Sequence, residues 1–314
     1  MLMLLSQAIE NLIVATRAAG RSRETVVAYR RKLRPLLAFL GDVPVEAITT
    51  HDLRRYVVSQ ADQTSLYADH LMHDERPGRL SPYTIAGRVR ALKRLFNWLV
   101  EEGAIETSPA RRIVTPRPGR REPKAATMED IAALLATAKS NSPADRRDRA
   151  IILLLADTGC RVGGLCDLEM SDANLDTRLV MLTEKGIKTR LVPLSDTVAA
   201  ALQAWLEARP QDRGPWLFVG LTARAKDRLT PSGVAQMLKR RARLAGVTGR
   251  VNPHAFRHFF AREFLLAGGN LATLADLLGH SNIEVTKSSY AIFAIEDLRE
   301  AHRRYSPVTR LEEQ

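Results

Sequence analysis

The chain has 314 residues, more than one compact hydrophobic core usually organises, so two domains are expected. Its 47 Lys and Arg residues against 35 Asp and Glu residues give a formal charge of +12, which favours a polyanionic partner such as nucleic acid, although basic ribosome-associated proteins, helicases and nucleases share this balance. The two cysteines lack zinc-site spacing, and the longest apolar run, residues 150–156, is too short to cross a membrane, so a cytoplasmic, soluble protein without a structural zinc is expected.

Amphipathic helices account for the first hundred residues. Apolar side chains recur at three- and four-residue spacing, without an intervening strand pattern, over residues 4–19, 24–40, 49–61 and 84–102. The last span has one apolar face, and its other positions include the basic residues Arg88, Arg90, Lys93 and Arg94. These four are candidates to contact a phosphate backbone, and the alternative is an ordinary solvated helix face.

A proline-rich basic segment follows these helices. Within residues 108–124, six Lys and Arg residues alternate with Pro109, Pro116, Pro118 and Pro123. Because proline blocks regular helix, we expect a helical domain over 1–108, an extended, solvated linker over 109–124 and a second domain over 125–314. Further candidates for DNA contact are the linker residues Arg117, Arg120 and Arg121, unless the linker is charged only to stay soluble.

The second domain is predicted to be mostly helical with a small β component. A helix begins after Thr127, whose hydroxyl can cap the first turn at Asp130. Further helices are expected over residues 147–158, 195–209, 230–244, 253–266 and 271–278. Strands over 179–182 and 189–194, joined through Glu184-Lys185-Gly186, predict a β-hairpin.

Four short segments in this domain contain the polar residues that chemistry would need. They are Thr158-Gly159-Cys160-Arg161, Glu184-Lys185-Gly186, His254-Ala255-Phe256-Arg257, and Gly279-His280 followed by Tyr290. Each alone has an ordinary explanation: a chance His-x-x-Arg, a solvated turn lysine, or a half-buried tyrosine that packs between helices.

The order and spacing of these segments resemble the tyrosine recombinase and phage integrase family across the second domain. Residues 158–161 are similar to the family's Thr-Gly-x-Arg box, and residues 184–193 to its lysine-bearing β-hairpin. Residues 254–258 match its His-x-x-Arg-His box, and residues 278–283, with Tyr290 ten residues after His280, resemble its terminal box. The helical first domain and basic linker resemble the family's core-binding domain and connector less specifically.

The resemblance implies a fold and an activity. The fold would be mainly α with a small β-hairpin or sheet in the C-terminal domain, arranged as a two-domain, C-shaped DNA clamp of a SAM-like core-binding domain and an integrase-type catalytic domain. The activity would be site-specific recombination through a 3′-phosphotyrosine intermediate, without metal, ATP or cofactor, in integration, excision or dimer resolution. A simpler, Xer-like architecture is favoured because no additional arm-binding domain is apparent.

The resemblance also implies partners. The substrate would be double-stranded DNA with paired half-sites, bound by a dimer per site and a tetramer in the synapse. An accessory DNA-bending protein or a partner recombinase is a further expectation, with a nucleoid-associated location and no membrane partner.

The residues themselves agree with phosphodiester chemistry. Attack on a phosphodiester builds negative charge on the non-bridging oxygens, which preorganised cationic donors stabilise. Arg161 and Arg257 can each present a planar fork of donors that matches phosphate. His254 shares a helix face with Arg257, three residues on, and is either a general base or a phosphate donor. His280 would add another donor.

Tyr290 fits the nucleophile, because a phosphotyrosine conserves the bond energy of the broken strand for rejoining. By resemblance, Lys185 is the general acid for the leaving 5′-hydroxyl and reaches it from a turn in the minor groove, with Lys188 as the alternative. A short amphipathic helix over residues 295–304 is also expected, docked on a neighbouring protomer as in the family or packed on its own domain.

Two other functions stay open, and a departure from the family pattern motivates the first of them. Where the family usually has an acidic residue three positions after the first arginine, this chain has Gly164, preceded by Gly163, and Asp167 is a candidate to take over as the brace. A cleavage-deficient DNA-binding or architectural protein of the same fold is therefore one alternative. The other is a type IB topoisomerase-like nicking and relaxing enzyme, which would not depend on two sites.

Overall fold

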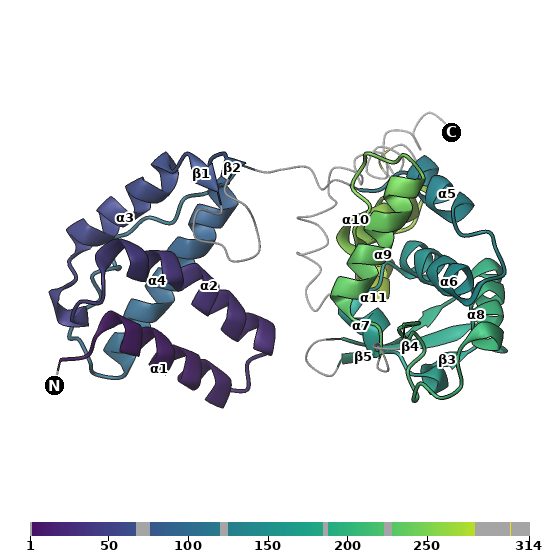
Figure 1. Ribbon diagram of the computed structural model, residues 1–314, viewed down its shortest axis with the longest axis horizontal. Coiled ribbons are helices and arrows are strands. Elements are labelled where there is room, and N and C mark those ends of the chain that lie inside the picture. The colour runs from purple at the N-terminus through teal and green to yellow at the C-terminus, as the bar shows by residue number, and fades with distance from the viewer. Residues whose placement is uncertain are drawn as a thin grey trace, which may run out of the picture. The chain divides into compact units, whose positions relative to one another are not determined.

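The computed structural model describes residues 2–66, 76–119, 125–184, 188–222, 228–279 and 302 (Figure 1). The chain divides into two compact units, Met1–Arg121 and Glu122–Gln314, and each is described by itself. Among the helices in these residues, none combines the length and the apolar character needed to span a membrane.

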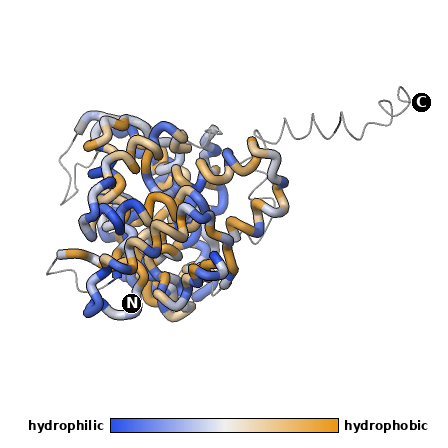
Figure 2. The backbone as a smooth tube through the Cα atoms, turned by 90° about the vertical axis from the view of Figure 1, so that its right-hand side faces the viewer, coloured by the Kyte–Doolittle hydropathy of each residue, from blue (hydrophilic) through white to orange (hydrophobic). Residues whose placement is uncertain are grey.

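The described part of the first unit contains four α-helices, which confirm the four that the apolar spacing predicts. With one short 3₁₀ helix, they are α1 (Leu5–Ala18), α2 (Arg23–Leu40), η1 (Val45–Ala47), α3 (Thr50–Asp62) and α4 (Pro82–Glu101). Ser22, Thr49 and Ser81 cap α2, α3 and α4 by accepting a hydrogen bond from a backbone N–H of the first turn. Orange and blue stretches alternate along the helices in Figure 2, as expected of helices that each bury one apolar face.

A short strand pair interrupts these helices, which the sequence did not predict. β1 (Ser65–Leu66) pairs antiparallel with β2 (Arg76–Pro77) between α3 and α4. Two residues are too few for an alternating pattern to be visible, so the expectation of helices without strands was wrong here.

The first half of the expected linker packs on the first unit. Ala110 and Ile113 are buried in its hydrophobic core. The Thr50 hydroxyl donates a 2.8 Å hydrogen bond to the Pro109 carbonyl, and the Tyr83 hydroxyl donates one of 2.8 Å to the Gly119 carbonyl. The expectation of a solvated segment from residue 109 was therefore wrong for this half, because Ala110 and Ile113 are buried in the core, although Val114 is exposed. Residues 120–124 lie outside the described residues.

The second unit surrounds the apolar helix α6 (Pro143–Thr158). The other elements described there are α5 (Met128–Ala136), α7 (Val162–Asp167), η2 (Met170–Asp172), β3 (Ala173–Asn174), β4 (Leu179–Glu184), β5 (Lys188–Pro193), α8 (Asp196–Ala208), α9 (Pro231–Leu244), α10 (Pro253–Leu266) and α11 (Leu271–Leu278). α6 packs against both α8 and α10 (Figure 1). The predicted hairpin is confirmed, with β3 added to give an antiparallel sheet in the order β3-β4-β5.

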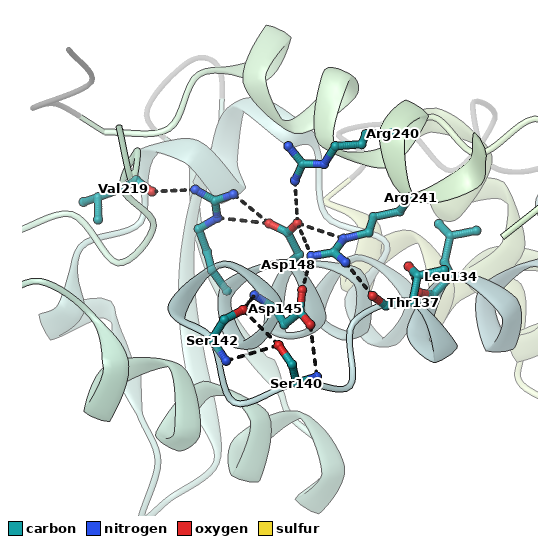
Figure 3. A network of polar contacts seen from close by, with 10 residues as sticks. Leu134, Thr137, Ser140, Ser142, Asp145, Asp148, Val219, Arg240 and Arg241 are labelled. Atoms are coloured by element: carbon teal, nitrogen blue, oxygen red, sulfur yellow. Dashed lines mark hydrogen bonds and ion pairs between the residues drawn. The ribbon is translucent and has the colours of Figure 1, made fainter. Parts of the chain in front are cut away.

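A buried carboxylate ties α6 to α9 (Figure 3). Asp148 is fully buried, and its Oδ1 accepts a 2.7 Å hydrogen bond from Nη2 of Arg147. Its Oδ2 accepts bonds of 2.9 Å from Arg240 and 2.7 Å from Arg241, both on α9. Burial of a charge is costly unless the charge is paired, and here the Asp148 carboxylate is paired with three guanidinium groups.

The same network holds the segment that leads into α6. Arg241 also donates 2.6 Å bonds to the Asp145 carboxylate and to the Thr137 carbonyl, just after α5. The adjoining Asp145 carboxylate accepts a bond from the Ser140 backbone N–H. One arginine on α9 thus fixes both the start of α6 and the connection that precedes it.

We expect Asp148→Asn to lower the free energy of unfolding of the second unit by about 3–5 kcal/mol, because it leaves the buried guanidinium of Arg147 without a charge partner and that of Arg241 with Asp145 alone. Urea unfolding of the full chain, followed by circular dichroism, measures this. Asp176→Asn, at an exposed turn position, is the matched control and should leave stability unchanged. Equal stability of the two variants would contradict a stabilising role for this network.

Candidate active site

A sharp turn between α6 and α7 presents the first predicted arginine. Gly159 ends α6 with φ +56°, in the left-handed region, and Arg161 is the N-cap residue of α7. An added Cβ on Gly159 would lie 2.8 Å from the ring of Phe260, so both the backbone conformation and the packing require glycine. Cys160 is buried inside the turn, whereas Arg161 is partly exposed.

Arg257 of α10 joins this turn to the end of α11. Its Nη1 donates a 2.8 Å hydrogen bond to the Gly159 carbonyl, and its Nη2 donates one of 2.8 Å to the Leu278 carbonyl. The last carbonyls of a helix have no partner within the helix, and a cation at a helix C-terminus is favourable. A guanidinium has five N–H donors, so an arginine held by two carbonyls can also donate to a phosphate.

Arg190 is a third arginine at this place, which the sequence analysis did not single out. Its Nε donates a 2.9 Å hydrogen bond to the Leu277 carbonyl, next to the carbonyl that Arg257 binds. Burial lowers the pKa of Arg190, and burial together with the positive charge of Arg190 lowers the pKa of Arg161. Arginine stays protonated in proteins, so both guanidinium groups keep their charge in these partly buried surroundings.

One sequence signal could have identified Arg190. Successive side chains of a strand point to opposite faces, and Arg190 has the same phase on β5 as the buried Val192 and Leu194 just beyond the strand. An arginine in the inward phase of a half-buried strand indicates a specific partner inside the domain.

The histidine box lies at the start of α10, as predicted. Pro253 is the first residue of α10, and Asn252 caps it by accepting a hydrogen bond from the Ala255 N–H. His254 is exposed, whereas Arg257 is buried with 6% of its surface accessible. Burial, with the nearby charges of His254 and Arg257, lowers the pKa of the half-buried His258.

Three of the predicted catalytic residues lie outside the described residues: Lys185, His280 and Tyr290. The expected helix over 295–304 lies there too, except at residue 302, and the side chain of Lys188 is not described. Their neighbours in the chain are described. Glu184 pairs with Lys188 at the end of the hairpin, and Gly279, with φ +66°, ends α11 directly before His280.

Gly164, which departs from the family pattern, and Gly163 before it are both in α7. Gly164 is buried, and a Cβ added to Gly163 would meet nothing within 4 Å among the described residues. Asp167, expected as a possible brace, forms an ion pair with Arg228 at a half-exposed position. Nothing in the described residues explains why position 163 is glycine.

The predicted DNA contacts of the first unit divide into two groups. Arg90 and Lys93 of α4, with Arg117, line a groove of about 730 Å³ that Arg111 and Arg112 also border. This groove gathers basic side chains from a helix and from the segment that follows it.

The remaining candidates on α4 have partners within the protein. The half-buried Arg88 donates a hydrogen bond to Gln60, and Arg94 forms a 3.0 Å ion pair with Glu101. Arg120 and Arg121 lie outside the described residues.

The described fold is similar to solved integrases. It matches the Tn1549 transposon integrase in complex with transposon right end DNA with a TM-score of 0.74 and 20% identity, over 96% of this chain and 99% of that chain. It matches a lambda integrase dimer bound to a COC′ core site with a TM-score of 0.69 and 18% identity, over 90% and 97% of the two chains. The chain therefore has the fold of a DNA integrase.

The sequence comparisons show the family. Residues 124–294 match the phage integrase family, and residues 15–103 match the phage integrase N-terminal SAM-like domain. Tyrosine recombinase XerC of Alcanivorax borkumensis is 34% identical over 272 residues, which cover 85% of this chain and 82% of that protein. XerD of Mycobacterium leprae is 32% identical over 292 residues, 88% of this chain and 89% of that protein. The chain belongs to the phage integrase family, and its activity is that of a tyrosine site-specific recombinase.

Gly159→Ala should destabilise the second unit more than Gly246→Ala does. Both glycines have a left-handed backbone, with φ of +56° and +67°, so each variant pays about 1 kcal/mol for that conformation. Only at Gly159 would the new Cβ also overlap Phe260 and Leu278, at 2.8 and 3.0 Å, which adds about 1–3 kcal/mol. Urea unfolding of both variants measures the difference, and equal losses would contradict the packing constraint.

His258→Gln should reduce the pH dependence of stability. The pKa of His258 is below its ordinary 6.5 in the folded chain, so on acidification the unfolded chain takes up this proton first. The stability that neutral His258 gives is fully present above the pKa of an unfolded-state histidine. It is lost as the pH falls through 6.5 towards the lower pKa of His258 in the folded chain. The free energy of unfolding is measured at about pH 7.5 and at about pH 5.5. Its decrease between these two pH values should be larger for the wild type than for the variant. An equal fall would show that burial of His258 does not contribute.

Proposed function

We propose that Tyr290 is the nucleophile and that Arg161, His254, Arg257 and His280 form the phosphate site. One observation carries the proposal: Arg257 binds the carbonyl that precedes the Arg161 turn and also the carbonyl at the end of α11, two residues before His280. Three sequence boxes that are far apart in the chain are thereby held at one place.

The chemistry that we propose balances without an external reactant. The Tyr290 phenol passes its proton to His254 or to solvent water as its oxygen attacks phosphorus, the bond to the 5′-oxygen breaks, and a 3′-phosphotyrosine forms. Arg161 and Arg257 stabilise the charge on the non-bridging oxygens. Lys185 gives the proton that the leaving 5′-hydroxyl needs, with Lys188 as the alternative donor, and attack by a 5′-hydroxyl of the partner strand reverses the step.

The remaining roles depend on neighbouring groups. The exposed position of His254 at the start of α10 suits either proton transfer or donation to the phosphate. His280 follows Gly279 directly in the sequence, and we propose it as a further donor to the phosphate.

We propose double-stranded DNA with paired half-sites as the substrate, bound by a dimer per site and by a tetramer in the synapse. The formal charge of +12 and the basic groove lined by Arg90, Lys93 and Arg117 support DNA binding. The solved relatives include XerH bound to a palindromic difH substrate and a lambda integrase dimer on a core site. A partner recombinase or a DNA-bending protein, and a place in the nucleoid, complete the proposal.

Tyr290→Phe should abolish covalent attachment to DNA and leave native binding intact, because only the phenol oxygen is removed. Purified protein is mixed with sheared genomic DNA and denatured in detergent, and the DNA that stays attached is sequenced. Tyr305→Phe, a second tyrosine of the same terminal segment, is the matched control and should attach like the wild type.

The other outcomes separate the remaining functions. Native retention of DNA without covalent attachment by the wild type would favour the cleavage-deficient binding protein, with Gly164→Glu as the next variant. Attachment with relaxation of a plasmid that contains one site and no partner would favour the topoisomerase-like activity.

A further inference from the structure

Arg190 connects two segments that the proposed chemistry needs. It lies on β5, the second strand of the hairpin whose turn contains Lys185, and it pairs with Leu182 of β4. From there its Nε donates a 2.9 Å hydrogen bond to the Leu277 carbonyl at the end of α11. The hairpin is thus attached to the helix that leads into His280.

The end of α11 is built around this contact. Arg190 and Arg257 bind the neighbouring carbonyls of Leu277 and Leu278, which lack partners inside the helix. The helix ends at Gly279, with φ +66°, where an added Cβ would overlap the Arg190 guanidinium. Only glycine allows both the left-handed turn and the close approach of Arg190.

A positive charge at position 190 costs free energy, and packing of the strand does not require a charged side chain there. Arg190 is half-buried, and its guanidinium and that of Arg257 bind neighbouring carbonyls, so its charge is partly desolvated and close to a like charge. A neutral side chain at this inward-facing position of β5 would pack there without this repulsion. The cost is offset if the site binds an anion and if the arginine fixes the geometry around it.

We propose that Arg190 is a positioning residue that locks the Lys185 hairpin onto the end of α11, so that the general acid reaches the leaving 5′-oxygen. This rests on the proposed function. Arg190 itself acts through Lys185 and does not donate the proton.

The test compares two leaving groups. Duplexes that contain the site recovered by covalent capture are made with the ordinary 5′-oxygen, or with a 5′-bridging sulfur, which leaves without a proton. Arg190→Met keeps most of the side-chain volume without the donor. It should slow covalent attachment to the ordinary duplex by on the order of 10²-fold, as expected for a misplaced catalytic group, and attach to the sulfur duplex at nearly the wild-type rate.

Three other variants calibrate this result. Lys185→Ala should show the same rescue by sulfur, whereas Arg161→Ala should be slow on both duplexes because it acts on the phosphate oxygens. Leu191→Gln changes the adjacent, 64% exposed residue on the opposite face of β5 and should behave like the wild type. Arg190→Lys, which retains a donor, should recover part of the rate on the ordinary duplex.

A second pair of variants disturbs the contact of Arg190 with α11 without changing Arg190 itself, in case Arg190→Met does not fold. Gly279→Ala would displace the Arg190 guanidinium, and Gly246→Ala imposes the same left-handed strain in open space. We expect rescue by sulfur for Gly279→Ala and wild-type rates for Gly246→Ala.

Two results would overturn the positioning role. One is an Arg190→Met protein that folds, binds the duplex and is as slow with sulfur as with oxygen. The other is an unchanged rate on the ordinary duplex. If covalent capture by the wild type recovers no site, the proposed function itself fails and the role of Arg190 fails with it, a result distinct from both.

Discussion

The hydrogen bonds of Arg257 to two helix ends are the interaction on which the catalytic unit depends. α6 and α11 each stop at a left-handed glycine, and their last carbonyls need donors that the helices cannot supply. A buried guanidinium supplies donors to both, and it places the turn before Arg161 beside the residue before Gly279. One side chain therefore completes two helix ends and also joins the segments of the proposed phosphate site.

The second unit uses buried arginines in two chemically different ways. Around Asp148, guanidinium groups bind carboxylates, so the charges are paired and the network serves to join α6 to α9. At the end of α11, Arg190 and Arg257 bind carbonyl oxygens, which orient a guanidinium without neutralising its charge. Positive charge that is oriented and retained is what a phosphate oxygen requires.

The first unit combines an apolar core with a basic groove on its surface. Its apolar stripes form the core, and residues 109–119 pack against that core instead of extending freely from it. This packing places Arg111, Arg112 and Arg117 beside Arg90 and Lys93, in one basic groove. Arg88, also on α4, instead donates a hydrogen bond to Gln60 of α3, so basic residues with equal prominence in the sequence have different surroundings.

The sequence by itself determined the helices, the hairpin and the family, because helix periodicity, capping residues and the order of short motifs are local properties of the chain. It also singled out Arg161, His254 and Arg257, all of which lie among the described residues. It missed Arg190, the packing of residues 109–119 and the β1-β2 pair, because strands of two residues show no period and because buried contacts join residues far apart in the chain. Only the tertiary structure decided which arginines meet carboxylates and which meet helix carbonyls, since that choice depends on what lies across the core from each side chain.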